Sequence, residues 1–164
     1  MKKTLFLTIF AGTLSLQTFA QDCSQIEKKV DEFGEETQYR PSGIHNAKLL
    51  CYQKENRSTY YLSLTTTGST LNTNEKGAYL ILANGEKIMK PDEEIDVEYN
   101  FAHIYGSKDY EYSAFFRLTK EEFDKLTAQP VRKFKLYIYE QDLKEEQQNE
   151  QIILANCLKN MTKN

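Results

Sequence analysis

Apolar and polar residues alternate along much of the chain beyond residue 46, with the period of two that is typical of β-strands. In residues 59–67, Tyr60, Leu62 and Leu64 share one face, and Tyr61 lies on the other. β-Branched and aromatic residues, which favour strands, dominate this segment. The same pattern predicts further strands over residues 48–53, 94–101, 110–118 and 131–140.

The clearest local signal lies in residues 77–90, GAYLILANGEKIMK. Asn84-Gly85 is the preferred pair for a two-residue type I′ hairpin turn, in which both residues adopt a positive φ. Such a turn makes Ile81 face Ile88 across the hairpin. The first arm is apolar on both faces, which predicts a central, covered strand.

Turn-forming residues separate the predicted strands. Residues 68–76 form a polar loop, and Pro91 and Asp92 are expected to end the second arm of the hairpin. A further loop covers residues 103–109, around Gly106.

In two of the predicted strands, the sequence also predicts which side chains are buried. Phe116 and Phe115 point to opposite faces of the strand over 110–118, which predicts that this strand is covered on both sides. In the strand over 131–140, Ile138 is expected to point into the core.

The segment after Leu118 has the best helix start in the chain. Thr119 is the expected N-cap, and Glu122 completes a capping box. Leu118 and Phe123 occupy the two positions of a hydrophobic staple. Pro130 ends this short helix, because proline cannot continue the helical hydrogen bonds.

A second helix is predicted at the C-terminal end, with Asp142 as its N-cap. Residues 144–151 contain no apolar side chain and are therefore expected to be exposed. The helix is expected to dock through its last turns, on a stripe made by Leu154, Cys157, Leu158 and Met161.

These elements predict an α+β fold. Six or seven mostly antiparallel strands form one curved sheet or a small β-sandwich, with a short connecting helix and a C-terminal helix. We divide the chain into a secretory signal peptide (1–20), a polar N-terminal segment (21–46) and a single α+β domain (47–164). Residues 24–33 fit a short helix or an extended chain equally well.

The first twenty residues predict export. Lys2 and Lys3 precede an apolar stretch, and residues 18–20 match a small-x-small cleavage site, which predicts a periplasmic or secreted protein cleaved near Ala20. The stretch is shorter than the roughly 20 apolar residues of a membrane span. Lipidation at Cys23 is disfavoured, because the two residues before it do not match a lipobox.

The charge balance disfavours two classes of partner. The chain has 21 basic and 24 acidic residues, and removal of Lys2 and Lys3 leaves a net charge of −5. The two signs are mixed along the sequence, so nucleic-acid binding and adsorption to anionic lipid are both unexpected.

Three cysteines, Cys23, Cys51 and Cys157, remain after cleavage. Export favours one disulfide and one free thiol, but the sequence does not choose among the three pairings. The alternative is that Cys51 and Cys157 are buried as small apolar residues. No CxxC occurs, and His45 and His103 are the only two histidines in the chain, so no metal site is predicted.

Motifs for catalysis and for cofactor binding are missing from the sequence, and a pair such as Cys51 with His45 or His103 is a weak candidate. The acidic residues between 92 and 98 fit a hydrated sheet face better than a catalytic pair. We therefore assign no catalytic, cofactor or metal residue.

Tyrosine is the unusual component, with eleven Tyr and no Trp. Tyrosine is common in strands and also at interfaces, and packing in the sheet is the favoured interpretation here. If an interaction surface exists, the segment 101–112 is its expected place, with His103, Tyr105 and Tyr110.

Four segments together resemble a group of small exported proteins of Bacteroidetes bacteria without an established activity. They are VDEFGEET at 30–37, KGAYLILANGEKI at 76–88, YEYSAFFRLTKEEFDKL at 110–126 and KFKLYIYE at 133–140. The resemblance spans most of the chain after the signal peptide, and it implies a bacterial origin and an envelope or secreted location. It supplies no catalytic residue.

The leading functional hypothesis is an exported, non-catalytic binding or interaction protein whose partner is a protein or small ligand of the cell envelope. Two alternatives stay open. One is an enzyme with an unrecognised hydrolase-type site, and the other is a periplasmic immunity protein that blocks a toxin.

Overall fold

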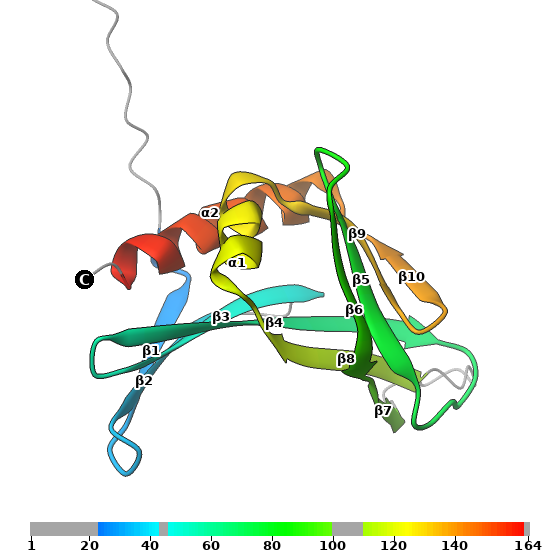
Figure 1. Cartoon of the computed structure of the whole chain (residues 1–164), viewed down its shortest axis with the longest axis horizontal. Helices are drawn as coiled ribbons and strands as arrows, with labels where there is room; N and C mark the ends of the chain where they lie inside the picture. The colour runs from blue at the N-terminus through cyan, green and yellow to red at the C-terminus, as the bar shows by residue number, and fades with distance from the viewer. Residues whose placement is uncertain (1–22, 43–45, 100–109, 163–164) are drawn as a thin grey trace, which may run out of the picture.

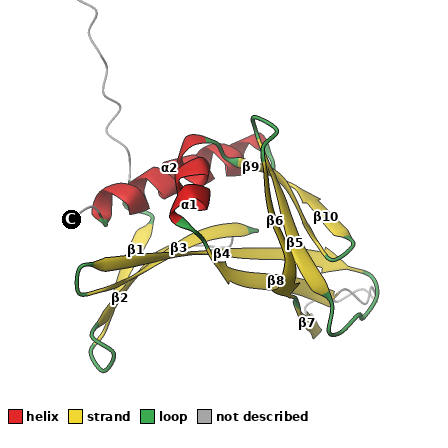
Figure 2. Cartoon of the chain, viewed as in Figure 1, coloured by secondary structure: helices red, strands yellow, loops and turns green. Residues whose placement is uncertain are grey.

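The computed structural model of the chain describes residues 23–42, 46–99 and 110–162. Within them, ten strands form two antiparallel sheets, and two helices pack against the sheets (Figures 1 and 2). In sheet order, the first sheet contains β1 (Ile26–Asp31), β2 (Glu36–Pro41), β3 (Ala47–Lys54), β4 (Arg57–Gly68), β8 (Tyr110–Arg117) and β7 (Asp96–Tyr99). The second contains β10 (Tyr139–Asp142), β9 (Val131–Leu136), β5 (Lys76–Leu82) and β6 (Lys87–Glu94).

The predicted fold class is confirmed: the protein is α+β, and its strands are antiparallel. The described residues form ten strands, in place of the six or seven predicted. Helix α1 (Lys120–Ala128) connects β8 to β9, and the C-terminal helix α2 (Glu145–Met161) lies over the six-stranded sheet (Figure 1). The segment that fitted helix or extended chain is extended, because residues 26–41 form the first two strands of this sheet.

The hairpin over 77–90 is confirmed, but the predicted turn and register are wrong. Gly85 has a φ of 88°, whereas Asn84 is not left-handed. The Gly85 N–H donates to the Leu82 carbonyl at 2.9 Å, and the Leu82 N–H donates to the Glu86 carbonyl at 2.8 Å. These bonds close a three-residue loop with one left-handed glycine, in place of a two-residue type I′ turn.

The longer loop shifts the pairing by one residue. Ile81 faces Lys87, and Leu80 faces Ile88. Ile88 therefore lies on the buried face with Leu80, while Met89 points to solvent. The loop is stabilised by the Asn84 side chain, which accepts a hydrogen bond from the Glu86 N–H at 3.0 Å.

The expected end of the arm at Pro91 and Asp92 is instead an irregularity: the β5–β6 register shifts between Lys90 and Glu94, and β6 continues to Glu94. β6 is an edge strand, where a proline without an N–H costs no ladder hydrogen bond. The predicted strand over 94–101 is instead divided. Glu94 ends β6 in one sheet, buried Ile95 crosses over, and β7 pairs with β8 in the other sheet.

The single strand expected over 131–140 is a hairpin of β9 and β10. Leu136 pairs with Tyr139 around a two-residue turn, and Tyr137 has a φ of 55°. Ile138 lies in this turn and is 59% exposed, so its predicted inward position is wrong. Alternation alone does not reveal this turn, because Tyr137 and Ile138 are both residues that favour strands.

Helix α1 begins as predicted. Thr119 Oγ1 accepts from the Glu122 N–H at 3.2 Å, and the Glu122 carboxylate accepts from the Thr119 N–H at 2.8 Å. Leu118 and Phe123, the staple positions, are both buried. Local capping chemistry therefore determines where this helix starts.

Helix α2 departs from the prediction at both ends. Lys144, not Asp142, is the N-cap, because β10 extends through Asp142. The first turns are mostly exposed, but Gln151 is buried and its Oε1 accepts from the Val131 N–H at 2.8 Å. Met161 was predicted to dock and is instead 41% exposed.

The core lies between the inner faces of the two sheets and the helices. Its fully buried side chains include Leu62 of β4, Phe134 of β9 and Leu158 of α2. A disulfide joins Cys23, just before β1, to Cys157 of α2, with Cα atoms 5.6 Å apart. Cys51 is free and buried. Among the described residues, neither helix combines the length and the apolar composition that crossing a membrane requires.

Candidate functional site

The predicted interaction surface is only partly within the described residues. His103 and Tyr105 lie outside them, as does His45. Tyr110 is described: it starts β8 opposite Gly68 and Tyr99, is half-buried and packs against the core. Tyr110 therefore belongs to the inner side of the sheet.

The Cys51 thiol was the candidate nucleophile, and its surroundings oppose that role. It lies on the inner face of β3 and is inaccessible to solvent. Burial raises the pKa of Cys51 to about 11, despite hydrogen bonds from the side chain of Ser58 and the backbone of Thr59 that lower it. A thiol in this state is protonated at neutral pH and is a poor nucleophile.

The acidic residues between 92 and 98 are arranged as expected for a hydrated edge. Glu94, Asp96 and Glu98 are exposed. Glu93 is half-buried, and desolvation raises its pKa while nearby Lys90 opposes the rise. In the ranges that the structure describes, no three His, Cys, Asp or Glu side chains form a group that fits a metal ion.

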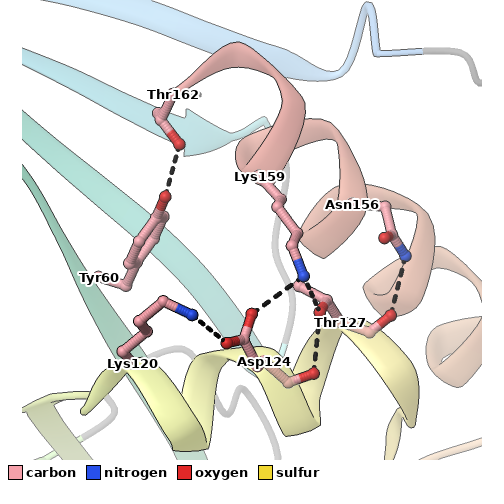
Figure 3. Close-up of polar contacts among 7 residues, drawn as sticks. All are labelled: Tyr60, Lys120, Asp124, Thr127, Asn156, Lys159 and Thr162. Atoms are coloured by element: carbon pink, nitrogen blue, oxygen red, sulfur yellow. Dashed lines mark hydrogen bonds and ion pairs between the residues drawn. The ribbon is translucent and has the colours of Figure 1, made fainter. Parts of the chain in front are cut away.

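A polar cluster joins the two helices to β4 (Figure 3). The Asp124 carboxylate accepts hydrogen bonds from Lys120 Nζ at 2.6 Å and from Lys159 Nζ at 2.9 Å. Lys159 also donates to Thr127 Oγ1 at 3.2 Å. Lys120 and then Lys159 lower the pKa of Asp124, so this carboxylate is a weak base.

Two further contacts complete this cluster. Asn156 Nδ2 donates to the Thr127 carbonyl at 3.0 Å, and the hydroxyls of Tyr60 and Thr162 lie 2.6 Å apart. Tyr60 also stacks on Phe123, with ring centroids 3.6 Å apart. The residues of this polar cluster bind one another, which indicates that the cluster fixes α1 and α2 to the sheet rather than binding a ligand.

A pair of tyrosines joins the two sheets. The rings of Tyr112 on β8 and Tyr139 on β10 lie 4.6 Å apart. Thr70 and Asn72, from the β4–β5 connection, hydrogen-bond both hydroxyls. Tyr112 is fully buried, so these polar groups satisfy a phenol that would otherwise be unpaired in the core.

The outer face of the six-stranded sheet carries a different group of rings. Tyr61 and Phe115 stack nearly parallel, at 4° with centroids 4.9 Å apart. Tyr52 meets Tyr61 edge to face at 5.2 Å. These three residues come from β3, β4 and β8, and their side chains point away from the helices. We call Tyr52, Tyr61 and Phe115 the outer aromatic strip.

A shallow hollow of about 410 Å³ adjoins the strip. The sheet register explains its position: Ser63 lies between Lys48 on β3 and Phe115 on β8. A serine is too short to fill the space between these longer side chains. The other residues that line the hollow are Glu27, Arg40, Pro41, Ser42 and Leu50.

The sequence contained part of this site. Tyr61 was assigned to the face opposite Leu62, which is correct, since Leu62 is fully buried and Tyr61 is not. The strand over 110–118 was expected to be covered on both sides, but its Phe115 is 47% exposed. The missing information was that β3, β4 and β8 are neighbours, which brings the three rings together.

Comparisons with known protein families, with curated proteins and with solved structures gave no match.

Proposed function

We propose that this chain is an exported, non-catalytic binding protein, and that the outer aromatic strip and its hollow form the binding surface. One observation carries the proposal: Phe115 is 47% exposed, although it is stacked on Tyr61 in the middle of a sheet. Ordered aromatic side chains at a solvent-exposed face are enriched in protein interfaces.

The strip is not needed to build the core. The inner faces of β3, β4 and β8 already supply buried residues such as Leu49, Leu62 and Phe116. The described helices both lie on that inner side (Figure 1), so no described element of this chain covers the rings. Partly exposed, preorganised aromatic rings bind at a low cost in conformational entropy.

The titratable groups support binding over catalysis. Burial raises the pKa of the Cys51 thiol to about 11 and raises the pKa of the Tyr60 phenol. Lysines lower the pKa of Asp124. Each of these shifts moves the group away from the pKa that a general base or nucleophile needs near neutral pH.

Export is part of the proposal. A disulfide between Cys23 and Cys157 is typical of proteins that mature in an oxidising compartment. The same bond uses the Cys23 sulfur, so it is incompatible with lipid attachment at that atom. It therefore supports an exported protein without a lipid anchor at Cys23.

Site-specific photo-cross-linking tests the proposal. Benzoylphenylalanine placed at Phe115, in cells that naturally make the protein, is expected to yield a discrete adduct with a binding partner. The matched control is Ile138, which is 59% exposed on the β9–β10 turn. Equal adducts at both positions, or an adduct at Ile138 alone, would contradict the proposed surface. Turnover of generic hydrolase substrates by the purified protein would contradict the non-catalytic role.

A further inference from the structure

The outer aromatic strip lies among basic residues, although acidic residues outnumber basic ones in the chain, 24 to 21. On the outer face, Arg117 pairs with Tyr61 and Lys48 pairs with Ser63. Lys54 and Arg57 face each other where β3 and β4 meet, and Lys54 also faces Glu36 on β2. Local positive charge on an acidic protein points to a negatively charged ligand.

Within the described residues, the cations of this face differ in their ion pairing. Arg40 is held by Glu27, with Nε 3.1 Å from Oε2. Among the described residues, by contrast, neither Lys48 nor Arg117 has a carboxylate within ion-pairing distance. Lys48 lines the hollow, and Arg117 is the cross-strand partner of Tyr61. A carboxylate that binds there would gain a partner without breaking an existing ion pair.

The four-stranded sheet also has a basic hollow on its outer face. This smaller hollow, of about 210 Å³, lies between Tyr79 and Met89 and is lined by Lys87, Lys133 and Lys135. Its Lys133 is already paired with Glu140 at 3.0 Å and with Asp142 at 3.6 Å. This second face provides a natural control surface.

The shape of the larger hollow limits the ligand. Ser63 leaves a space that opens between Leu50 and Phe115, and its volume of about 410 Å³ accommodates one large apolar side chain. The β7 edge sets a boundary, because Glu98 and Glu111 face each other there and would repel a negative ligand. The contact is therefore centred on β3, β4 and the Arg117 end of β8.

We infer that the ligand is an acidic peptide segment of another protein, which inserts one apolar side chain into the hollow and places carboxylates on Lys48 and Arg117. This inference rests on the proposed binding function and specifies its partner class. The apolar side chain supplies contact area against Phe115, and the carboxylates supply specificity and a fast encounter.

Peptide selection tests this inference with a defined probe. The oxidised full chain is immobilised and challenged with a phage library of random dodecapeptides, and the strongest selected peptide is then measured by fluorescence anisotropy. We expect selected sequences rich in Asp and Glu around an apolar residue, with affinity that falls as salt rises. A basic consensus, or no enrichment, would overturn the inference.

Variants locate the binding. Lys48→Glu is expected to lower the affinity for the selected peptide by about tenfold or more, because it reverses the charge at the hollow. Ser63→Tyr fills the hollow from the outer face and is expected to abolish binding. Lys87→Glu on the other sheet is the control and should change affinity less than about twofold. Unchanged affinity in both Lys48→Glu and Ser63→Tyr, with intact thermal unfolding, would refute the assigned site.

The two tests separate the two proposals. A cross-link at Phe115 together with a basic consensus, or with no selected peptide, leaves the binding function standing and rejects only the acidic partner. A missing cross-link at Phe115 together with unselective peptides rejects both.

Discussion

The two faces of the six-stranded sheet differ sharply, although they are built from the same strands. Leu62 and Leu64 on the inner face of β4 are fully buried beneath the helices. Their sequence neighbours Tyr61 and Ser63 face solvent on the outer side, beside the exposed Phe115. Because successive side chains of a strand point to opposite faces, the residues that stabilise the core and those of the proposed binding surface alternate along β4. Substitutions on the inner face should therefore reduce stability, and substitutions on the outer face should affect binding.

Leu62→Ala is the change with the largest expected effect. It removes a fully buried side chain from the inner face and leaves a cavity, so it should cost about 2–5 kcal/mol of unfolding free energy. Ser63→Ala, one residue away on the outer face, should cost less than about 0.5 kcal/mol. Urea unfolding of both variants measures the difference. Similar costs would show that the two faces are not separated as described.

Loss of the disulfide is expected to have the second-largest effect on the free energy of unfolding. The pair Cys23→Ser and Cys157→Ser releases the chain before β1 from α2, across a sequence separation of 134 residues, and should cost about 2–4 kcal/mol. Thiol titration provides the direct check. The unfolded, unreduced protein should expose one reactive thiol per chain, from Cys51, and three thiols would contradict the disulfide.

Glu122→Gln tests the contact between α1 and the four-stranded sheet. Partial burial raises the pKa of Glu122, but hydrogen bonds from Lys90 and from the Thr119 N–H outweigh this effect and lower it below 4.5. The carboxylate therefore stabilises the fold above pH 4.5, and this contribution is lost as the pH falls through the lowered pKa.

We expect Glu122→Gln to cost about 1 kcal/mol at pH 7, from the weakened capping box and the lost pair with Lys90, 2.8 Å away. The cost should vanish in strong acid, where the native carboxyl is also protonated. Thermal unfolding from pH 7 to pH 3 compares the variant with the native chain. A difference that grows toward low pH would have the wrong sign.

The sequence predicts those parts of the fold that local chemistry determines. The Thr119 capping box, the alternation in β4 and the hairpin over 77–90 depend on neighbouring residues, and all three are present. One error is local, because the turn at Asn84-Gly85 has three residues in place of the predicted two. Other errors depend on how the strands are arranged. Pro91 is tolerated because β6 is an edge strand, and Ile138 is exposed because Tyr137 begins a turn.

The proposed site belongs to this second group. Tyr52, Tyr61 and Phe115 are separated in sequence, and only the order β3-β4-β8 brings them together. Ser63 shows the same limit, because a serine on a strand indicates a hollow only when its cross-strand neighbours are known to be Lys48 and Phe115. In the segment chosen from the sequence, His103 and Tyr105 lie outside the described residues, and Tyr110 begins β8.

Phe115→Ser is expected to affect stability less than Leu62→Ala or loss of the disulfide, and it tests the central claim most directly. It removes the stack with Tyr61 from the outer face, which should cost only about 0.5–1 kcal/mol, or about 1–4 °C in Tm. Binding of the peptide or partner captured at this face should be lost, whereas Met89→Ser on the other sheet should leave binding intact. The measurement is thermal unfolding and partner binding on the same oxidised samples. A near-native Tm with binding abolished is the predicted result, and a near-native Tm with binding unchanged would contradict the account.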